Sequence, residues 1–406
     1  MPGVLDAPSE SEWHGLWQER RRVVDGSPGA CGDARRAMRI AFIVNNYPPR
    51  VGGVELHVRN LARGLIAQGH RVLVVTLSDR PGRADDDGID VVRLREHFRI
   101  GDILGFPSAG ATRRVARLLK ELDIDVVSIH TRFFPMSWVG LRAARRASLP
   151  VIHTEHGSDH VVSPSPAIRI GSRAVDLTIG RFVLRQATEV IGVSENVIAF
   201  VRRLSGRTDA RVFYNAIDAA PAKIDRSPRR HVVFVGRLVP GKGAEVFVQA
   251  LAMLAADGVE FTAEILGDGV SADAIAASVV RAGLEGRVTL RGRVELAEVS
   301  RSLAGGVLVN PSTLAEGFQT TILEALEVGG SVVSYDLPGV RILREQGFAV
   351  DLVEQKNAEA LADAIRLRLD SPWTVRPMEG WHWSTRASEY ALLAADVRRR
   401  VAMVEN

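Results

Sequence analysis

The sequence contains a single cysteine, Cys31, among its 406 residues. One thiol cannot form an internal disulfide, so a disulfide framework is excluded and a reducing compartment is expected. No run reaches the roughly 18–20 consecutive apolar residues of a membrane-spanning helix. The polar, acidic N-terminus also lacks the basic start and apolar core of a secretory signal. The sequence therefore predicts a cytoplasmic protein.

A large excess of charge of one sign is also absent. The 52 basic and 48 acidic side chains leave a formal net charge of +4. This balance does not indicate a nucleic-acid-binding protein, although it leaves a weak attraction to an anionic membrane surface open. The content of 46% hydrophobic and 25% charged residues is ordinary for a globular protein. The length suits two domains.

Apolar segments of the strand type alternate with amphipathic segments of the helix type along most of the chain. Residues 38–49 read as a buried strand, 50–70 as a Gly-Gly turn that opens a helix, and 71–77 as the next strand. Strands that are apolar on both faces and alternate with helices indicate a parallel sheet covered on both sides. The same pattern restarts at residue 231. We therefore expect an α/β fold with two doubly wound, Rossmann-like domains.

A polar segment that contains proline and lacks periodicity separates the two halves, and we interpret it as a linker. Residues preceding Met38 are rich in Pro, Gly, Ser and charge, and we expect a disordered extension there. A short amphipathic helix around residues 13–24 is the alternative, and Met38 is an alternative start of the protein. The expected division is an extension at 1–37, an N-terminal domain at 38–215, a linker at 216–230, a C-terminal domain at 231–378 and a final helical segment at 379–406.

Residues 315–339 combine a Gly-Phe turn with a helix start. Glu316 falls in the turn, and Glu324 falls in the first turns of the helix that begins after Thr320. Carboxylates at a helix N-terminus can bind hydroxyls, and the free backbone N–H groups there favour a phosphate. The pattern predicts a nucleotide-sugar site, with ordinary helix capping as the alternative.

A glycine-rich loop, GRLVPGKG, follows the first strand of the C-terminal half. Gly236 and its neighbouring glycines allow close approach of a ligand to the backbone, and Arg237 and Lys242 suit a diphosphate. A solvated turn with two surface cations is the alternative. Neither half has GxGxxG or GxxxxGK[ST] after its first strand. A Rossmann dehydrogenase or a P-loop enzyme is therefore disfavoured.

Further glycines end other predicted strands. The GDG at 267–269 and the RGRV at 291–294 are either plain turns or walls of a base and ribose site, which would involve Gly267 and Val294. Gly53 opens the first predicted helix, where an anion could dock.

Titratable side chains are concentrated at the end of the strand near residue 153. Histidines and carboxylates at this density suit a metal, but strand alternation points neighbours to opposite faces, so few of them can converge. We therefore favour a catalytic or substrate-orienting histidine over a metal site. The group consists of His153, Glu155, His156, Asp159 and His160.

Over residues 38–370 the chain resembles the retaining family 4 glycosyltransferases of GT-B fold. The resemblance rests on seven motifs in order, namely GGVELHV, TEHG, VSENV, FYNAID, FVGRLVPGKG, LGDG and AEGFQTTILEAL. It implies a nucleotide-sugar donor held by the C-terminal domain, an acceptor held by the N-terminal domain, and no cofactor or obligatory metal. It also implies that the helix at 379–401 crosses back to the first domain.

The same resemblance assigns roles by position. Glu324 would hold the ribose hydroxyls, Glu316 the donor-sugar hydroxyls, and Arg237 and Lys242 the diphosphate. His156 would act near the reacting carbon, so that His156 and Glu316 are the expected catalytic residues. The expected donor-binding residues are Gly53, Gly236, Arg237, Lys242, Gly267, Val294, Glu316, Gly317, Phe318, Thr320 and Glu324.

The expected chemistry follows from charge. Departure of a nucleoside diphosphate builds negative charge that cations and helix N–H groups stabilise, while the sugar becomes oxocarbenium-like. No carboxylate is clearly placed as a nucleophile, so we expect front-side attack by the acceptor, with retention implied by the family alone. Three positions depart from the family pattern: Gln319, Ala216, and Arg341 near the place of an expected glutamate. The last puts the donor contact of that loop in doubt.

Other interpretations stay open. A sugar-nucleotide epimerase or a phosphorylase could use the same fold, and so could a non-catalytic nucleotide-sugar-binding protein. The acceptor could be a glycolipid, a polysaccharide or a small molecule. The Arg-rich stretches 113–120 and 141–148 are either solvated helix faces or a peripheral membrane contact. The oligomeric state is not predicted.

Overall fold

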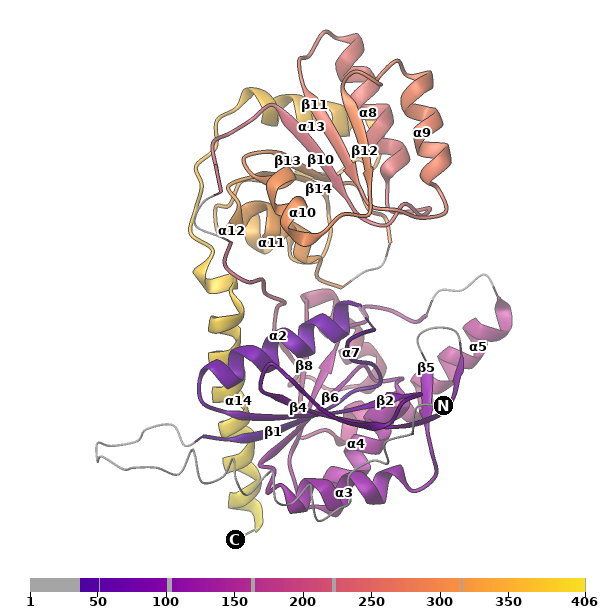
Figure 1. Ribbon diagram of the computed structural model, residues 1–406, viewed down its shortest axis with the longest axis vertical. Coiled ribbons are helices and arrows are strands. Elements are labelled where there is room, and N and C mark those ends of the chain that lie inside the picture. Colours follow the sequence, from indigo (N-terminus) through magenta and orange to yellow (C-terminus); the bar gives the residue numbers. More distant parts are fainter. Residues whose placement is uncertain are drawn as a thin grey trace, which may run out of the picture.

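The computed structural model describes residues 37–50, 52–100, 104–161, 165–220, 224–314 and 317–405. Figure 1 shows two α/β bodies stacked along the long axis, with the C-terminal helix running beside the N-terminal body. The extension expected at 1–37 lies, apart from residue 37, outside the described residues. Two parallel-sheet domains are present, which confirms the predicted fold class.

The first sheet has the strand order β3-β4-β2-β1-β6-β7-β8-β9, and β5 pairs with β4. Its central strands pair in parallel because each connection carries a helix. The strands are β1 (Arg39–Ile43), β2 (Arg71–Ser78), β3 (Gly82–Asp86), β4 (Ile89–Ile100), β5 (Leu104–Pro107), β6 (Val126–His130), β7 (Val151–Glu155), β8 (Glu189–Gly192) and β9 (Arg211–Val212). The helices are α2 (Gly53–Ala67), α3 (Ala111–Glu121), α4 (Pro135–Arg146), α5 (Pro166–Val175), a π-helical stretch η1 (Asp176–Gly180), α6 (Arg181–Gln186) and α7 (Glu195–Ser205).

The edge of this sheet differs from the sequence expectation. The strand expected at 89–94 continues to Ile100, and β3 and β5 pair with it in antiparallel fashion. The sequence of β3, GRADD, is polar and largely exposed. An edge strand without a buried face carries no hydrophobic signal, so it was not predicted.

The second sheet has the order β12-β11-β10-β13-β14-β15, with parallel pairing throughout. Its last strand, β15, was also not predicted, because its four residues are short of a periodic signal. The strands are β10 (His231–Val235), β11 (Thr262–Leu266), β12 (Val288–Gly292), β13 (Val307–Asn310), β14 (Ser331–Tyr335) and β15 (Val350–Val353). The helices are α8 (Ala244–Ala256), α9 (Ala272–Arg281), α10 (Leu296–Leu303), α11 (Thr320–Glu327), α12 (Val340–Glu345) and α13 (Ala358–Asp370).

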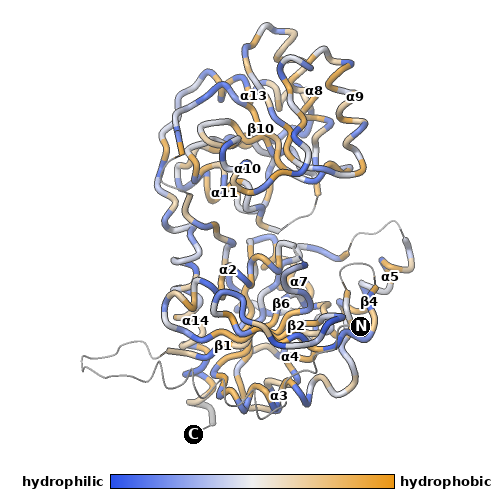
Figure 2. The backbone as a smooth tube through the Cα atoms, viewed as in Figure 1, coloured by the Kyte–Doolittle hydropathy of each residue, from blue (hydrophilic) through white to orange (hydrophobic). Residues whose placement is uncertain are grey.

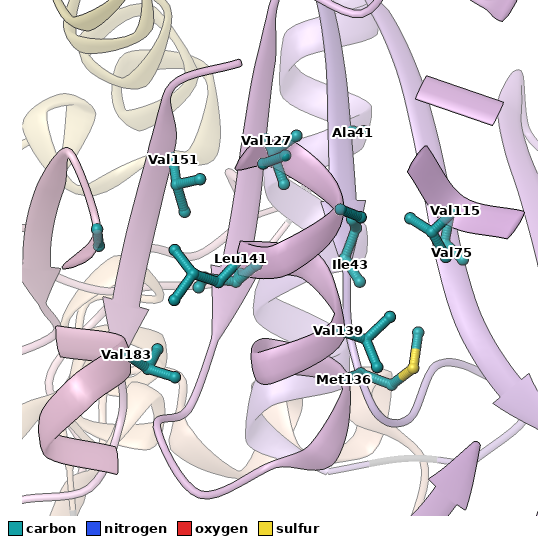
Figure 3. Packing of buried hydrophobic residues seen from close by; sticks show 14 of the residues in the cluster. Ala41, Ile43, Val75, Val115, Val127, Met136, Val139, Leu141, Val151 and Val183 are labelled. Carbon is teal, nitrogen blue, oxygen red and sulfur yellow. The ribbon is translucent and has the colours of Figure 1, made fainter. Parts of the chain in front are cut away.

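Alternate residues of each central strand feed separate cores on the two faces of the sheet. In β1, Ala41 and Ile43 join a core built by α3, α4, α6 and α7. Ile40 and Phe42 join a second core with α2 and the C-terminal helix. Figure 3 shows the first of these cores, where Ile43 and Val127 of the sheet face Val139 of α4. The hydrophobic colour of Figure 2 follows the strands for the same reason.

Strand order also determines where a ligand can bind. In the first sheet β1 lies between β2 and β6, and in the second β10 lies between β11 and β13. Successive crossovers leave such a strand in opposite directions, which opens a crevice at its carboxyl end. The loops after β1, β6 and β7 and those after β10, β11 and β13 are therefore the places to examine.

The chain passes between the two bodies twice, and the two passages are paired. Ile217 and His382 form a parallel bridge. The Ile217 amide donates to Trp381 O (3.0 Å), and the Trp383 amide donates to Ile217 O (3.0 Å). After a short 3₁₀ turn, η2 (Glu379–Trp381), the helix α14 (Trp383–Glu405) returns to the N-terminal sheet.

The helix α14 packs against α2. Gly64 of α2 allows the close approach, because a Cβ there would lie 2.8 Å from Ala387 Cβ. Tyr390 is fully buried beneath α14, and its hydroxyl bonds Ser128 Oγ of β6 at 2.7 Å. None of the helices that the structure describes combines the length and hydrophobicity needed to cross a bilayer.

Candidate active site between the two domains

The loops after β10 and β11 lie against each other. The Gly236 amide donates to Leu266 O (3.0 Å), and the Gly267 amide donates to Gly292 O (2.8 Å). A Cβ at Gly267, which has φ of 140°, would lie 1.8 Å from Gly236 O. Only glycine fits this approach, so Gly267 has a packing role besides the donor role expected for it.

The loop after β13 closes the same corner. The Thr313 amide donates to Gly241 O (2.8 Å), and a Cβ at Gly243 would lie 2.4 Å from Pro311 O. Gly243 is followed by the first residue of α8, so the free N–H groups of that helix begin beside the loop. Between these glycines, Arg237 is exposed and Lys242 is half-buried.

The helix α11 begins at Thr320, after a cap residue, Gln319, whose side chain makes no capping bond. Gln319 instead accepts from Asn310 Nδ2 at 2.7 Å, so the place of the frequent glycine is filled by a residue bonded to β13. Burial raises the pKa of Glu324, and a hydrogen bond from Thr320 partly offsets this. A carboxyl that is this poorly hydrated gains from ligand hydroxyls that donate to it.

Phe318 anchors the turn before α11. Its ring is buried and stacks on Trp381, with the ring centroids 5.6 Å apart. Gly339, at φ 88°, leaves room for it, since a Cβ there would lie 2.0 Å from the Phe318 ring. The exit of the same stretch carries Arg341, which forms an exposed bidentate ion pair with Asp336.

Glu316 lies outside the described residues, so its expected roles remain predictions. The next residue, Gly317, is in contact with the other domain. A Cβ on Gly317 would lie 2.9 Å from His156 O and 3.4 Å from Val193 Cγ2. The turn of the C-terminal domain that resembles a donor loop therefore touches the TEHG segment of the N-terminal domain.

His156 belongs to a cluster of three histidines at this contact. His57 comes from α2 and His130 from the end of β6. His130 Nδ1 lies 3.1 Å from His156 Nε2, and the His57 ring stands edge-on to that of His156 at 4.8 Å. Elements that begin far apart in the sequence thus bring three imidazoles together at the switch-point crevice of the first sheet.

All three imidazoles are neutral at pH 7. Burial lowers the pKa of His57 to about 4. Burial also lowers the pKa values of His130 and His156 well below the ordinary range, and the neighbouring histidines add to the shift. Neutral rings offer one donor and one acceptor nitrogen each, so the cluster can orient polar groups without adding positive charge to the site.

Hydrogen bonds order these rings. Ser128 Oγ lies 3.1 Å from His130 Nε2 and accepts from the Tyr390 hydroxyl. In a consistent arrangement of protons, Ser128 donates to His130 and His130 Nδ1–H donates to His156 Nε2. The C-terminal helix thereby influences which nitrogen of His156 carries its proton.

Asn215 connects the cluster to the donor loop. Its Oδ1 lies 2.7 Å from His57 Nδ1, and its Nδ2 donates to Phe318 O at 3.3 Å. The Nδ1–H of His57 is therefore its donor, which leaves the buried His57 Nε2 as an acceptor without a partner among the described residues. One side chain at the domain boundary thus bonds both halves of the candidate site.

The same three histidines are a candidate metal site. One nitrogen from each lies within 4.8 Å of the others, and neutral imidazole suits zinc and similar ions. The closest pair, however, is already at hydrogen-bond distance, and two nitrogens that share a proton cannot both coordinate. The group can hold a metal only by giving up the bond between His130 and His156.

The other polar residues expected near His156 serve a buried ion pair instead. Arg132, Glu155 and Asp176 are completely buried, and Arg132 bonds the Glu155 carboxylate at 3.0 Å and that of Asp176 at 2.9 Å. Burial alone would raise the pKa of Glu155, but Arg132 and the hydrogen bond with His153 outweigh it and hold that pKa well below its ordinary value. His160 bonds Asp176 at 2.6 Å.

This network orients the TEHG segment. Glu155 Oε1 accepts from the backbone amides of His156 (3.1 Å) and Gly157 (3.0 Å), and Asp159 contributes its carbonyl to Arg132 (3.0 Å). The expected division of the polar cluster by strand alternation is therefore found, with His156 separate from the others.

Two further expected donor residues lie apart from this contact. Gly53 is the exposed first residue of α2, and nothing lies within 4 Å of a Cβ built on it. Val294 follows β12 and packs against the core of the C-terminal domain. A pocket of about 240 Å³ opens between the domains beside the site, lined by the ends of β13 and β14 and by α7.

Sequence reasoning missed four residues here. His57 and Asn215 lie in the GGVELHV and FYNAID motifs, so the motifs could have singled them out. His130 ends a fully buried strand, and a polar residue at such a place is a usable signal. Arg132, two residues later, follows no pattern that predicts burial.

Comparison with known proteins agrees with this geometry. Residues 51–220 match the model of glycosyltransferase family 4, and residues 229–371 match that of the glycosyl transferases group 1. A phosphatidylinositol N-acetylglucosaminyltransferase of Arabidopsis thaliana is 28% identical over 84% of this chain and 76% of its own. The phosphatidyl-myo-inositol mannosyltransferase of Mycobacterium tuberculosis is 26% identical over 89% of this chain and 96% of its own.

Solved structures show the same fold. HepE of Anabaena, crystallised with UDP, superposes with a TM-score of 0.63 at 22% identity, over 90% of this chain and 99% of its own. The lipopolysaccharide outer core galactosyltransferase WaaB gives 0.65 at 16% identity, over 88% and 100%. Both domains, their order and the cleft between them are accounted for together. The chain belongs to the family 4 glycosyltransferases and has their GT-B fold.

Proposed function

We propose that this glycosyltransferase moves a sugar from a nucleotide-diphosphate-sugar to a hydroxyl of a lipid-linked acceptor, with retention of the anomeric configuration. The observation that carries the proposal is the contact between Gly317 of the donor-type loop and His156 of the facing domain. Two relatives named for transfer to phosphatidylinositol support an acceptor of the glycolipid class. A polysaccharide acceptor is the second choice.

The C-terminal domain would hold the donor. Lys242 and Arg237 would neutralise the diphosphate, whose negative charge grows as the glycosidic bond breaks. The free N–H groups at the start of α11 add partial positive charge at the same place. Glu324 would accept from the ribose hydroxyls, which relieves its desolvated carboxyl. Charge is thus stabilised more strongly in the transition state than in the bound donor.

The N-terminal domain would orient the acceptor and the reacting sugar. His156 is neutral because burial lowers its pKa well below 6.5. A neutral imidazole can bond a sugar hydroxyl without repelling the positive charge that develops on the sugar ring. Glu316 would bond donor-sugar hydroxyls from the opposite loop. With no side-chain nucleophile assigned, the acceptor oxygen would attack from the face that the diphosphate leaves.

The donor is a substrate, and the proposed reaction needs no further cofactor and no obligatory metal. The protein would act in the cytoplasm, at the inner face of the membrane, where a lipid-linked acceptor presents its head group.

The first test is a thermal-shift screen of nucleotide-sugars. A donor at 100 times its dissociation constant stabilises the folded protein by about 2.7 kcal/mol. Glu324→Ala and Lys242→Ala should lose this shift and remain folded, whereas Arg341→Ala, which changes an exposed ion pair, should keep it. Full transfer activity in both site variants would contradict the assignment.

The second test follows the product. NMR of the transferred sugar should show the anomeric configuration of the donor, and an inverted product would refute retention. Conversion of the donor without an acceptor would indicate an epimerase, and a requirement for inorganic phosphate would indicate a phosphorylase. Saturable donor binding without transfer to any extracted lipid or glycan would indicate a non-catalytic binding protein.

A further inference from the structure

The segment from residue 161 to residue 182 exposes an unusual amount of hydrophobic surface. Six large apolar side chains of this short stretch are exposed, and Ile170 is 71% accessible. The helix α5 has no buried residue at all. Figure 1 shows α5 projecting from the edge of the N-terminal domain. The six are Val161, Ile168, Ile170, Leu177, Ile179 and Phe182.

These side chains do not result from a loosely attached helix. Asp176, directly after α5, is completely buried and bonds Arg132. Val183 and Leu184 of α6 are buried in the same core as α4. The segment is therefore anchored at its C-terminal end, while α5 and η1 present their apolar side chains outward.

The apolar and basic side chains of α5 separate onto different faces. Ala167, Ile170 and Ala174 are spaced by three and four residues and are all exposed, so they form one stripe along the helix. Arg169 and Arg173 are four residues apart and lie on another face. A helix with a basic face and an exposed apolar stripe is typical of helices that lie in a membrane interface.

The charge around the stripe is positive. Between residues 160 and 188 the only carboxylate is Asp176, which is neutralised in the buried pair. Arg181 and Arg185 follow on α6. The neighbouring α4 carries Arg142, Arg145 and Arg146, and it packs against α3 with its own basic face. All four helices cover the same side of the first sheet.

We propose that α5 and η1 form a membrane-docking surface that inserts its apolar stripe into the interface of an anionic lipid bilayer. The arginines of α5 and α6 would bond lipid phosphates, and those of α3 and α4 add long-range attraction. The inference rests on the proposed function in one respect, since a lipid-linked acceptor explains why the enzyme docks. The contact itself requires neither donor nor acceptor.

Vesicle flotation of the whole protein tests the proposal without any sugar substrate. Wild-type protein should float with vesicles of phosphatidylcholine plus phosphatidylglycerol, bind vesicles of phosphatidylcholine alone more weakly, and dissociate as salt is raised. Ile170→Asp should lower the partition coefficient at least about tenfold, the loss expected for one buried aliphatic side chain. Arg173→Ala should lower it about fivefold.

Val280→Asp is the matched control, because Val280 is a 57% exposed aliphatic residue on α9 of the other domain. It should bind vesicles as wild type does. Ile170→Asp should keep the wild-type melting temperature, since Ile170 supports no core. Equal flotation of wild type and Ile170→Asp would overturn the proposal. So would a failure of wild type to float while Ile170→Asp converts a dimer to a monomer, since the stripe would then join two copies.

The result is separable from that of the transfer assay. Sugar transfer by a protein that never floats would leave the proposed function intact and remove the docking surface. Flotation by a protein that transfers no sugar would do the reverse.

Discussion

The buried ion pair beneath the TEHG segment is predicted to contribute strongly to stability. Arg132 faces two carboxylates, those of Glu155 and Asp176, and all three side chains are inaccessible to solvent. Arg132→Met keeps most of the side-chain volume and removes the charge, which leaves two carboxylates buried without their cation. Breaking a buried pair in this way costs about 3–5 kcal/mol.

The loss should depend on pH. In wild type the pKa of Glu155 is held well below its ordinary value, so its contribution is present above the ordinary pKa and is lost as pH falls towards the lowered one. In the variant, burial without Arg132 raises the carboxyl pKa instead. The folded variant then takes up protons that the unfolded chain does not, so its deficit is greatest at neutral pH and shrinks towards pH 5.

Thermal unfolding at pH 7 and pH 5 measures both effects. At roughly 2–4 °C per kcal/mol for a domain of this size, the N-terminal transition should fall by about 6–20 °C at pH 7. The control is Arg341→Met, which breaks an exposed pair with Asp336 and should leave the transition unchanged. A deficit at pH 7 below about 1 kcal/mol, or one as large at pH 5, would refute the reasoning.

Three other predictions concern the cleft. Gly339→Ala should weaken nucleotide-sugar binding in calorimetry, because its Cβ would displace the Phe318 ring; Gly258→Ala, with a similar φ of 73° and no neighbour within 4 Å, should not. Asn215→Ala should lower the free energy of unfolding by about 1–3 kcal/mol, since a buried imidazole loses its partner, and should reduce transfer more than donor affinity; unchanged kinetics would count against a link between the domains. Because the pKa of His57 is lowered from 6.5 to about 4, its stabilising effect is present above pH 6.5 and about 3 kcal/mol is lost as pH falls through this window; urea unfolding of His57→Phe should show a shallower pH dependence, and an equal one would exclude His57 as the cause.

The fold could be predicted because its strands are simple. β1, β6 and β7 are buried on both faces, so each appears in the sequence as a short apolar run between helices. The strands that escaped prediction, β3, β5 and β15, lie at sheet edges or are short, and they have no continuous buried face. Hydrophobic pattern records burial, so an element that buries little leaves little signal.

The candidate site was predictable only where it is local. Thr320 and Glu324 share one helix, and Arg237 and Lys242 share one loop, so their spacing is visible in the sequence. The histidine cluster draws on α2, β6 and the loop after β7, and Asn215 follows β9. Their proximity results from strand order, which a single sequence does not display. Arg132 illustrates the same limit, because its burial depends on carboxylates 23 and 44 residues away.

The paired passages between the two bodies have a mechanical consequence. Ile217 and the chain before Trp383 are joined by main-chain hydrogen bonds, so the two connections cannot lengthen or slide independently. The domains can then move mainly by rotation about this one edge, as about a hinge pin. Figure 1 shows these passages on one side of the molecule and α5 on the other. Opening the cleft therefore changes the gap most on the side of α5, where a membrane-bound acceptor would arrive.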